Sequence, residues 1–220
     1  MFAREYGIGA TAETTQAHLE DTTASASTSI WLGGGLTSIV AGALLVAGHL
    51  FDFGSPVGTG AVIGKSFILV AHLLTILALI GIYAAQVARM RLLGHVGMVL
   101  SVLGTALVSG VVLVEIAGAS GADVEAVLAG GVAGMLATLA GLAFFVGLIL
   151  FGIATMRAAV FPRWAGLLLI AGDLVFAAGT SAGTAAPIFT FGGAVLTCAG
   201  FGWLGLTLMA RARSARRAAR

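Results

Sequence analysis

SFILVAHLLTILALIGIYAAQV, residues 66–87, contains no Asp, Glu, Lys or Arg, and only His72 titrates near neutral pH. A helix needs roughly 20 apolar residues to cross a hydrocarbon layer about 30 Å thick, and this segment meets that requirement. Five further apolar runs surround it, at 30–51, 93–116, 127–156, 164–180 and 188–210. The pattern predicts an all-α integral membrane protein, a bundle of six transmembrane helices with lipid as its solvent.

The overall composition agrees with a membrane protein. Hydrophobic residues make up 59% of the 220 residues and charged residues 9%, whereas soluble domains carry about 25% charged residues. We predict three parts: a polar N-terminal lead-in (1–27), a six-helix transmembrane domain (28–210) and a basic tail (211–220). The lead-in lacks the apolar core of a signal peptide, and its residues 22–28 suggest flexible or loosely helical chain.

The basic residues predict the orientation. With six spans, ten of the eleven fall on one side: Arg4, Arg89, Arg91, Arg157, Arg163, Arg211, Arg213, Arg216, Arg217 and Arg220. Lys65 is the exception, on the side of Asp52, Asp123 and Glu125. The positive-inside rule therefore places both termini in the cytoplasm, in the plasma membrane of a prokaryote. The arginines from Arg211 onward are predicted to anchor the tail on anionic headgroups.

Two patterns concern the packing of the helices. Similar helix ends at 83–89, 152–157 and 205–211 suggest three helical hairpins as repeats, with chance similarity as the alternative. Small residues four apart, such as Gly34, Ser38 and Gly42, let helix backbones approach closely. We interpret this stripe as packing within the chain rather than as a dimer face. Cys198, the single cysteine, is predicted to be a small packing residue.

The sequence favours a non-enzymatic role. It has no phosphate-binding loop ending in Lys-Ser/Thr, no His-Glu-x-x-His and no Gly-x-Ser-x-Gly. The basic tail is explained by orientation and lipid anchoring, so no nucleic acid partner is predicted. The predicted partners are the lipid bilayer and other membrane subunits, or further copies of the chain.

Asp173 is the sharpest functional candidate because it lies inside an apolar run. An ionised carboxylate at that depth costs roughly 2.5–3.5 kcal/mol on insertion scales, so it should face the bundle. One interpretation is a proton or cation site. The other is a neutral Asp that bonds a hydroxyl such as Thr197 or Ser109, or that caps a broken helix.

A second group is predicted near the outer face. His49 and Asp52 end the first run, His72 lies in the second and Glu115 closes the third. Glu115 and Asp52 are candidates for an ion or proton path, and His49 and His72 for binding haem or a divalent metal. Interfacial capping or snorkelling is the alternative for all four.

Three stretches carry a resemblance: Ile82-Tyr-Ala-Ala-Gln86, Leu93-Gly94 before a Gly-rich run, and Met156-Arg-Ala-Ala-Val-Phe-Pro-Arg-Trp-Ala-Gly166. Over residues 30–210 the chain resembles uncharacterised small polytopic membrane proteins of GC-rich prokaryotes. The resemblance implies a polytopic fold and no particular activity.

Three functions follow as hypotheses. The first is a non-catalytic accessory or structural subunit of a membrane assembly, suggested by short loops and small-residue stripes. The second is a small proton- or ion-coupled transporter that uses Asp173 with Glu115 or His72. The third is an electron-transfer protein that binds haem or metal through His49 and His72.

Overall fold

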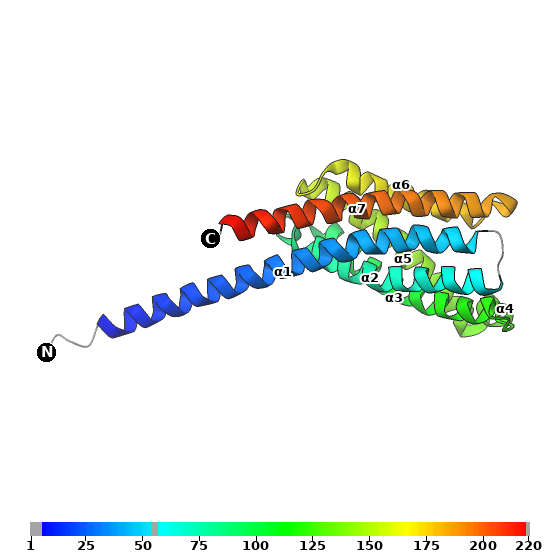
Figure 1. The fold of residues 1–220 in the computed structure, drawn as a ribbon, viewed down its shortest axis with the longest axis horizontal. Helices are drawn as coiled ribbons and strands as arrows, with labels where there is room; N and C mark the ends of the chain where they lie inside the picture. The colour runs from blue at the N-terminus through cyan, green and yellow to red at the C-terminus, as the bar shows by residue number, and fades with distance from the viewer. Residues whose placement is uncertain (1–5, 54–56, 219–220) are drawn as a thin grey trace.

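The structure is a computed structural model that describes residues 6–53 and 57–218, with side chains from residue 25 onward. Across the described residues the chain forms seven α-helices and two short 3₁₀ turns (Figure 1). Their order is α1 (Tyr6–Asp52), α2 (Thr59–Ala84), η1 (Val87–Arg89), α3 (Leu92–Ala119), α4 (Glu125–Ala129), α5 (Gly131–Ala158), α6 (Arg163–Gly179), η2 (Gly183–Ala185) and α7 (Ala186–Ala218). The all-α prediction is confirmed.

Within residues 6–53 and 57–218, five helical segments are long and apolar enough to cross a membrane. They lie in α1, α2, α3 and α5 and in the segment 183–218 that contains α7. The sixth predicted span corresponds to α6, which has 17 residues and so lies at the lower end of the length that a span requires. The structure therefore supports a polytopic membrane protein with five candidate spans among the described residues, and a sixth span at α6 stays a prediction.

The predicted fourth span, 127–156, does not form one helix. The chain breaks between α4 and α5, where Gly130 is extended and Gly131 has φ +63°, a left-handed conformation that favours glycine.

The next break follows α5, where Ala159 is left-handed (φ 52°) and Pro162 immediately precedes α6. A left-handed residue ends a helix and proline cannot continue one, so this turn is set locally.

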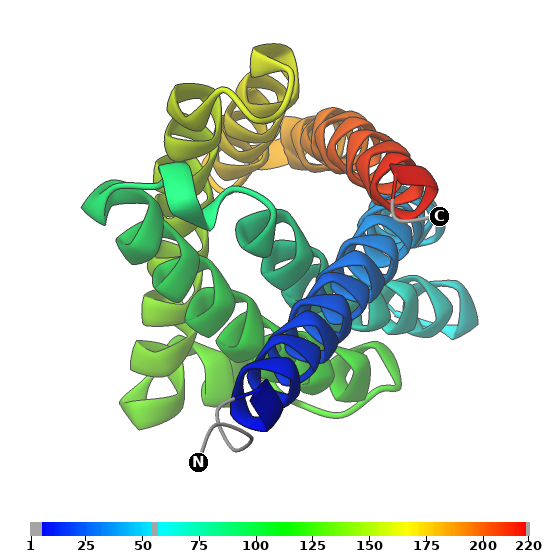
Figure 2. The ribbon, with the colours of Figure 1, turned by 90° about the vertical axis from the view of Figure 1, so that its left-hand side faces the viewer.

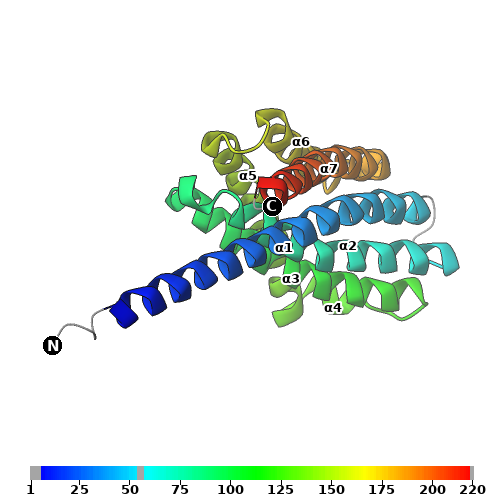
Figure 3. The same ribbon diagram turned by 60° about the vertical axis from the view of Figure 1, so that its left-hand side comes forward.

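The predicted lead-in is helical where the structure describes it. Helix α1 begins at Tyr6 and runs without interruption to Asp52, so residues 22–28 belong to it. Its N-terminal part projects well beyond the other helices (Figures 1 and 3). Two of the predicted cytoplasmic arginines, Arg4 and Arg220, lie outside the described residues.

The long helices close into a ring. Each packs mainly on its neighbours along the chain, in the order α1, α2, α3, α5, α6 and α7, and α7 then packs on α1. Figure 2 shows this arrangement along the bundle, with α7 beside α1. Because consecutive helices run in opposite directions, residues from the end of one and the start of the next gather at the same end of the ring.

Small residues hold the ring together. A Cβ on Gly34 would lie 2.5 Å from the Cα of Gly81, so α1 and α2 approach through backbone alone. Ser38 is fully buried and donates a hydrogen bond of 2.7 Å to the carbonyl of Phe201 in α7. Gly42 packs against Cys198. All three members of the predicted stripe therefore make contacts within the chain, and Cys198 is a packing residue here.

The apolar core fills one end of the ring. It is formed by the second halves of α2, α5 and α7 and the first half of α6, together with the turns at that end. Its largest fully buried side chains include Leu79, Ile82, Phe151 and Leu204. The opposite end of the ring is filled less completely.

Candidate functional site

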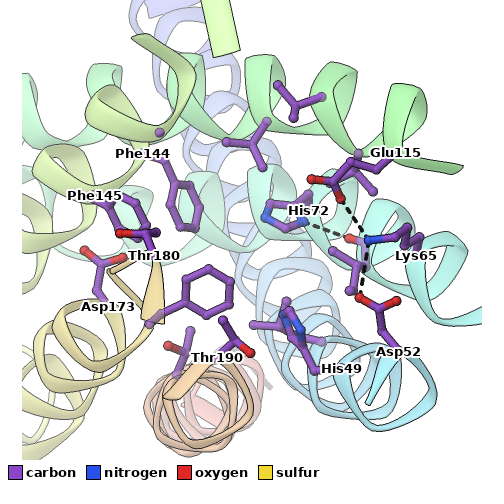
Figure 4. A pocket seen from close by; sticks show the side chains of 18 of the residues that line it. His49, Asp52, Lys65, His72, Glu115, Phe144, Phe145, Asp173, Thr180 and Thr190 are labelled. Carbon is purple, nitrogen blue, oxygen red and sulfur yellow. Dashed lines mark hydrogen bonds and ion pairs between the residues drawn. The ribbon is translucent and has the colours of Figure 1, made fainter. Parts of the chain in front are cut away.

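The less filled end contains a cavity of about 460 Å³ to which all six long helices contribute. Its ionisable lining residues are His49, Asp52, Lys65, His72, Glu115 and Asp173. Every ion, proton, haem or metal candidate proposed from the sequence therefore lines one cavity (Figure 4). The ring topology causes this convergence, because the end of α1, the start of α2 and the end of α3 meet there.

A charged cluster lies on one side of the cavity. Lys65 Nζ is 3.3 Å from Asp52 Oδ2 and 3.2 Å from Glu115 Oε2, so one ammonium bridges carboxylates from α1 and α3 (Figure 4). The side chains of Lys65, Asp52 and Glu115 are 15%, 23% and 39% exposed, so the cluster is only partly buried. Asp52 Oδ1 is buried and has no hydrogen-bond partner among the residues that the structure describes.

Asp173 lies on the side of the cavity away from Lys65 (Figure 4). It is 3% exposed, and its Oδ2 atom has no hydrogen-bond partner among the described residues. The predicted hydroxyl partners do not bond it: Ser109 donates to the Thr105 carbonyl, and Thr197 lines the cavity without reaching the carboxylate. Helix α6 also continues past Asp173, so capping of a broken helix is wrong as well. A buried polar group without a partner is costly, and its position on a cavity makes Asp173 a candidate contact for a ligand.

The two histidines differ in their hydrogen bonds. His72 Nδ1 lies 2.8 Å from the carbonyl of Ile68, which can only accept, so Nδ1 carries the proton and donates. His49 Nε2 is buried, and no described residue forms a hydrogen bond with it. In the described part of the chain, no three His, Cys, Asp or Glu side chains gather closely enough to hold a metal ion. The described residues therefore do not provide three such side chains for the predicted divalent-metal site. Haem binding stays a prediction.

Aromatic rings form a wall between the two histidines. His72 contacts Phe144 (centroids 5.6 Å apart), Phe144 contacts Phe145 (5.7 Å), Phe145 contacts Phe176 (6.2 Å), and Phe176 contacts His49 edge-on (5.2 Å). All five residues line the cavity. An apolar, aromatic wall with a few polar groups is typical of small-molecule sites.

Lys65 is the site residue that the sequence analysis did not select. Lys65 was noted only as the exception to the charge asymmetry, yet two features of the sequence could have identified it as a site residue. Lys65 is the sole basic residue on its side of the predicted membrane, and it lies seven residues before His72, on the same face of a helix.

The predicted anchor lies at the opposite end of the ring. Arg211 donates to the carbonyl of Val160 and its guanidinium lies 5.7 Å from the centre of the Phe161 ring, so it fixes α7 to the turn before α6. The side chains of Arg213, Arg216 and Arg217 are exposed. Arg211 therefore has a structural contact in addition to its predicted place at the headgroups.

Comparison with known proteins identifies no relative. No protein-family model matches the chain, and neither a curated protein nor a solved structure is similar to it. The fold and the site define an all-α polytopic membrane protein with an ionisable, aromatic-walled cavity between its helices.

Proposed function

We propose that this protein binds a small organic cation in the cavity, as the binding step of proton- or ion-coupled transport. The observation that carries the proposal is the buried carboxylate of Asp173, which faces the cavity with an unpartnered oxygen. A ligand that brings a positive charge or a hydrogen-bond donor to this oxygen would satisfy it.

The charge of the lining favours a cation. Three carboxyl groups and one ammonium line the cavity, and the ammonium of Lys65 is already engaged by Asp52 and Glu115. The faces of aromatic rings attract cations, most strongly where water is excluded. Phe144, Phe145 and Phe176 supply such rings between the two histidines.

A cavity toward one end of the ring, with a packed core at the other, is the arrangement that a transporter needs in one of its states. The cavity lies at the Lys65 end, while the apolar cluster around Phe151 and Leu204 fills the ring at the arginine end. Alternating access then requires the helices to separate at this cluster and close around Lys65. The hydrogen bond from Gln86 Nε2 to Thr155 Oγ1 (2.9 Å) joins α5 to the turn between α2 and η1 and would be part of the closed end.

We further propose six spans, with both termini on the cytoplasmic side of a prokaryotic plasma membrane. Arg89, Arg91 and Arg157 line a common pocket, and Arg211 bonds the turn before α6, so these basic residues share one end of the ring. The short α6 carries the chain from that end to the cavity, since Thr180 directly after it lines the cavity. Three hairpins in succession would agree with this path, and their origin as repeats stays a prediction.

Cation binding is tested with tetraethylammonium and tetraphenylphosphonium, measured by calorimetry on the purified, detergent-solubilised protein. Asp173→Asn keeps the shape of the side chain and removes its charge. Neither probe can donate a hydrogen bond, so the substitution removes only the attraction between the cation and the carboxylate, and we expect Kd to rise about 10- to 100-fold, equivalent to about 1.4–2.7 kcal/mol. Asp123→Asn is the matched control, because Asp123 is exposed and does not line the cavity.

The proposal fails if neither cation binds, or if both variants bind as the unchanged protein does. The accessory-subunit role stays a prediction, and the same preparation tests it. Stoichiometric co-purification of another membrane protein, without cation binding, would favour that role instead.

A further inference from the structure

A second pocket lies at the arginine end of the ring. It has a volume of about 360 Å³ and is lined by Arg89, Arg91, Leu93, Gly94, Ala154 and Arg157. Arg89 ends the short turn η1, Arg91 immediately precedes α3, and Arg157 is in the last turn of α5. Three exposed arginines from two separate parts of the chain therefore line one pocket.

No described side chain neutralises these charges. The ion pairs in the described part of the chain both involve Lys65, at the other end of the ring. None of the three arginine side chains has a hydrogen bond there either. Like charges around one pocket repel each other, and a bound anion removes that repulsion.

The backbone adds a further attraction for an anion. Helix α3 begins at Leu92 without a side-chain cap: the N–H of Gly94 donates to the carbonyl of Arg91, and the N–H groups of Leu92 and Leu93 have no side-chain acceptor. Leu93 and Gly94, in that first turn, line the pocket. The positive end of a helix favours negative charge, and here it coincides with the three guanidinium groups.

We propose that this pocket binds a phosphate group, as the headgroup of an anionic phospholipid or as a soluble phosphate. Guanidinium groups bind phosphate oxygens in a forked, bidentate geometry, which makes arginine the usual residue for this chemistry. The pocket lies where α2 and α5 end and α3 begins, and these are candidate spans, so it lies at the depth of the headgroups. This inference does not depend on cation binding in the cavity.

The test uses the full chain in nanodiscs of phosphatidylcholine containing a few per cent of phosphatidylglycerol, with bound lipid counted by native mass spectrometry. A separate arm titrates inorganic phosphate by calorimetry. The first variant, R89Q/R91Q/R157Q, removes the three pocket charges. The matched control, R213Q/R216Q/R217Q, removes three charges from the exposed face of α7 at the same end. A third variant, R89K/R91K/R157K, keeps the charge that orients the protein and removes only the forked geometry.

We expect the unchanged protein to retain phosphatidylglycerol preferentially, the pocket variant to lose at least tenfold in affinity, and the control to stay within about twofold. The lysine variant should fall between them. Binding of phosphatidylglycerol alone would identify a lipid site, and binding of inorganic phosphate at millimolar concentration would identify a soluble ligand. Equal losses in the pocket and control variants would show general attraction to anions and overturn the proposal, as would absence of binding in both arms.

Discussion

Replacement of one glycine tests the close crossing of α1 and α2. Gly34 is buried, and a Cβ added to it would lie 2.5 Å from the Cα of Gly81, which is backbone and has no rotamer to change. Carbon atoms approach to about 3.5 Å, so Gly34→Ala would have to part the helices by about 1 Å. Overpacking of this kind costs about 1–3 kcal/mol.

The neighbouring glycine supplies the control. Gly33 is exposed, and a Cβ on it would meet nothing within 4 Å. Both substitutions gain the same helix propensity, so the difference between the variants isolates the crossing. We expect Gly34→Ala to be less stable than Gly33→Ala by about 1–3 kcal/mol, in reversible SDS unfolding followed by circular dichroism. Stabilities equal within about 0.5 kcal/mol would refute the packing described for this crossing.

Two further predictions concern one hydrogen bond and the topology. Ser38→Ala removes a buried hydrogen bond to an α7 carbonyl and should lower the unfolding free energy by about 0.6–1.7 kcal/mol. Thr37→Ala is the control and should lower it by less, because the Thr37 hydroxyl bonds only carbonyls of its own helix. Equal losses would contradict this. The orientation is tested by cysteine labelling in a Cys198→Ala background. An impermeant maleimide should label Ser120→Cys in intact cells, but should label Ala88→Cys only after permeabilisation. Labelling of both cysteines in intact cells would exclude the proposed orientation.

The apolar runs predict most of the helices, because the cost of unsatisfied backbone groups in lipid leaves the chain few alternatives to helix. The break within 127–156 was not predicted. It depends on the left-handed conformation of Gly131, and a Gly- and Ala-rich apolar run gives no local sign of where such a residue lies. The helical start of the chain was predicted only as an alternative, since a polar segment lacks the apolar period that indicates a helix.

Candidate site residues were found from the cost of placing charge in a membrane, which selects Asp173, His72 and Glu115 without any knowledge of their neighbours. The residues that these side chains contact could not be predicted from the sequence. The expected bond from Asp173 to Thr197 or Ser109 is absent, because the hydroxyl of Ser109 bonds its own helix instead.

The sequence by itself therefore determined that this is a helical membrane protein and which ionisable residues would lie among its apolar helices. Only the tertiary structure decided that the helices close into a ring, that six ionisable residues line one cavity, and that three arginines border a pocket at the other end. The physical reason is that lipid-facing and protein-facing apolar surfaces have the same composition. The direction in which each helix faces is set by contacts between backbones far apart in the chain, such as those at Gly34 and Gly81.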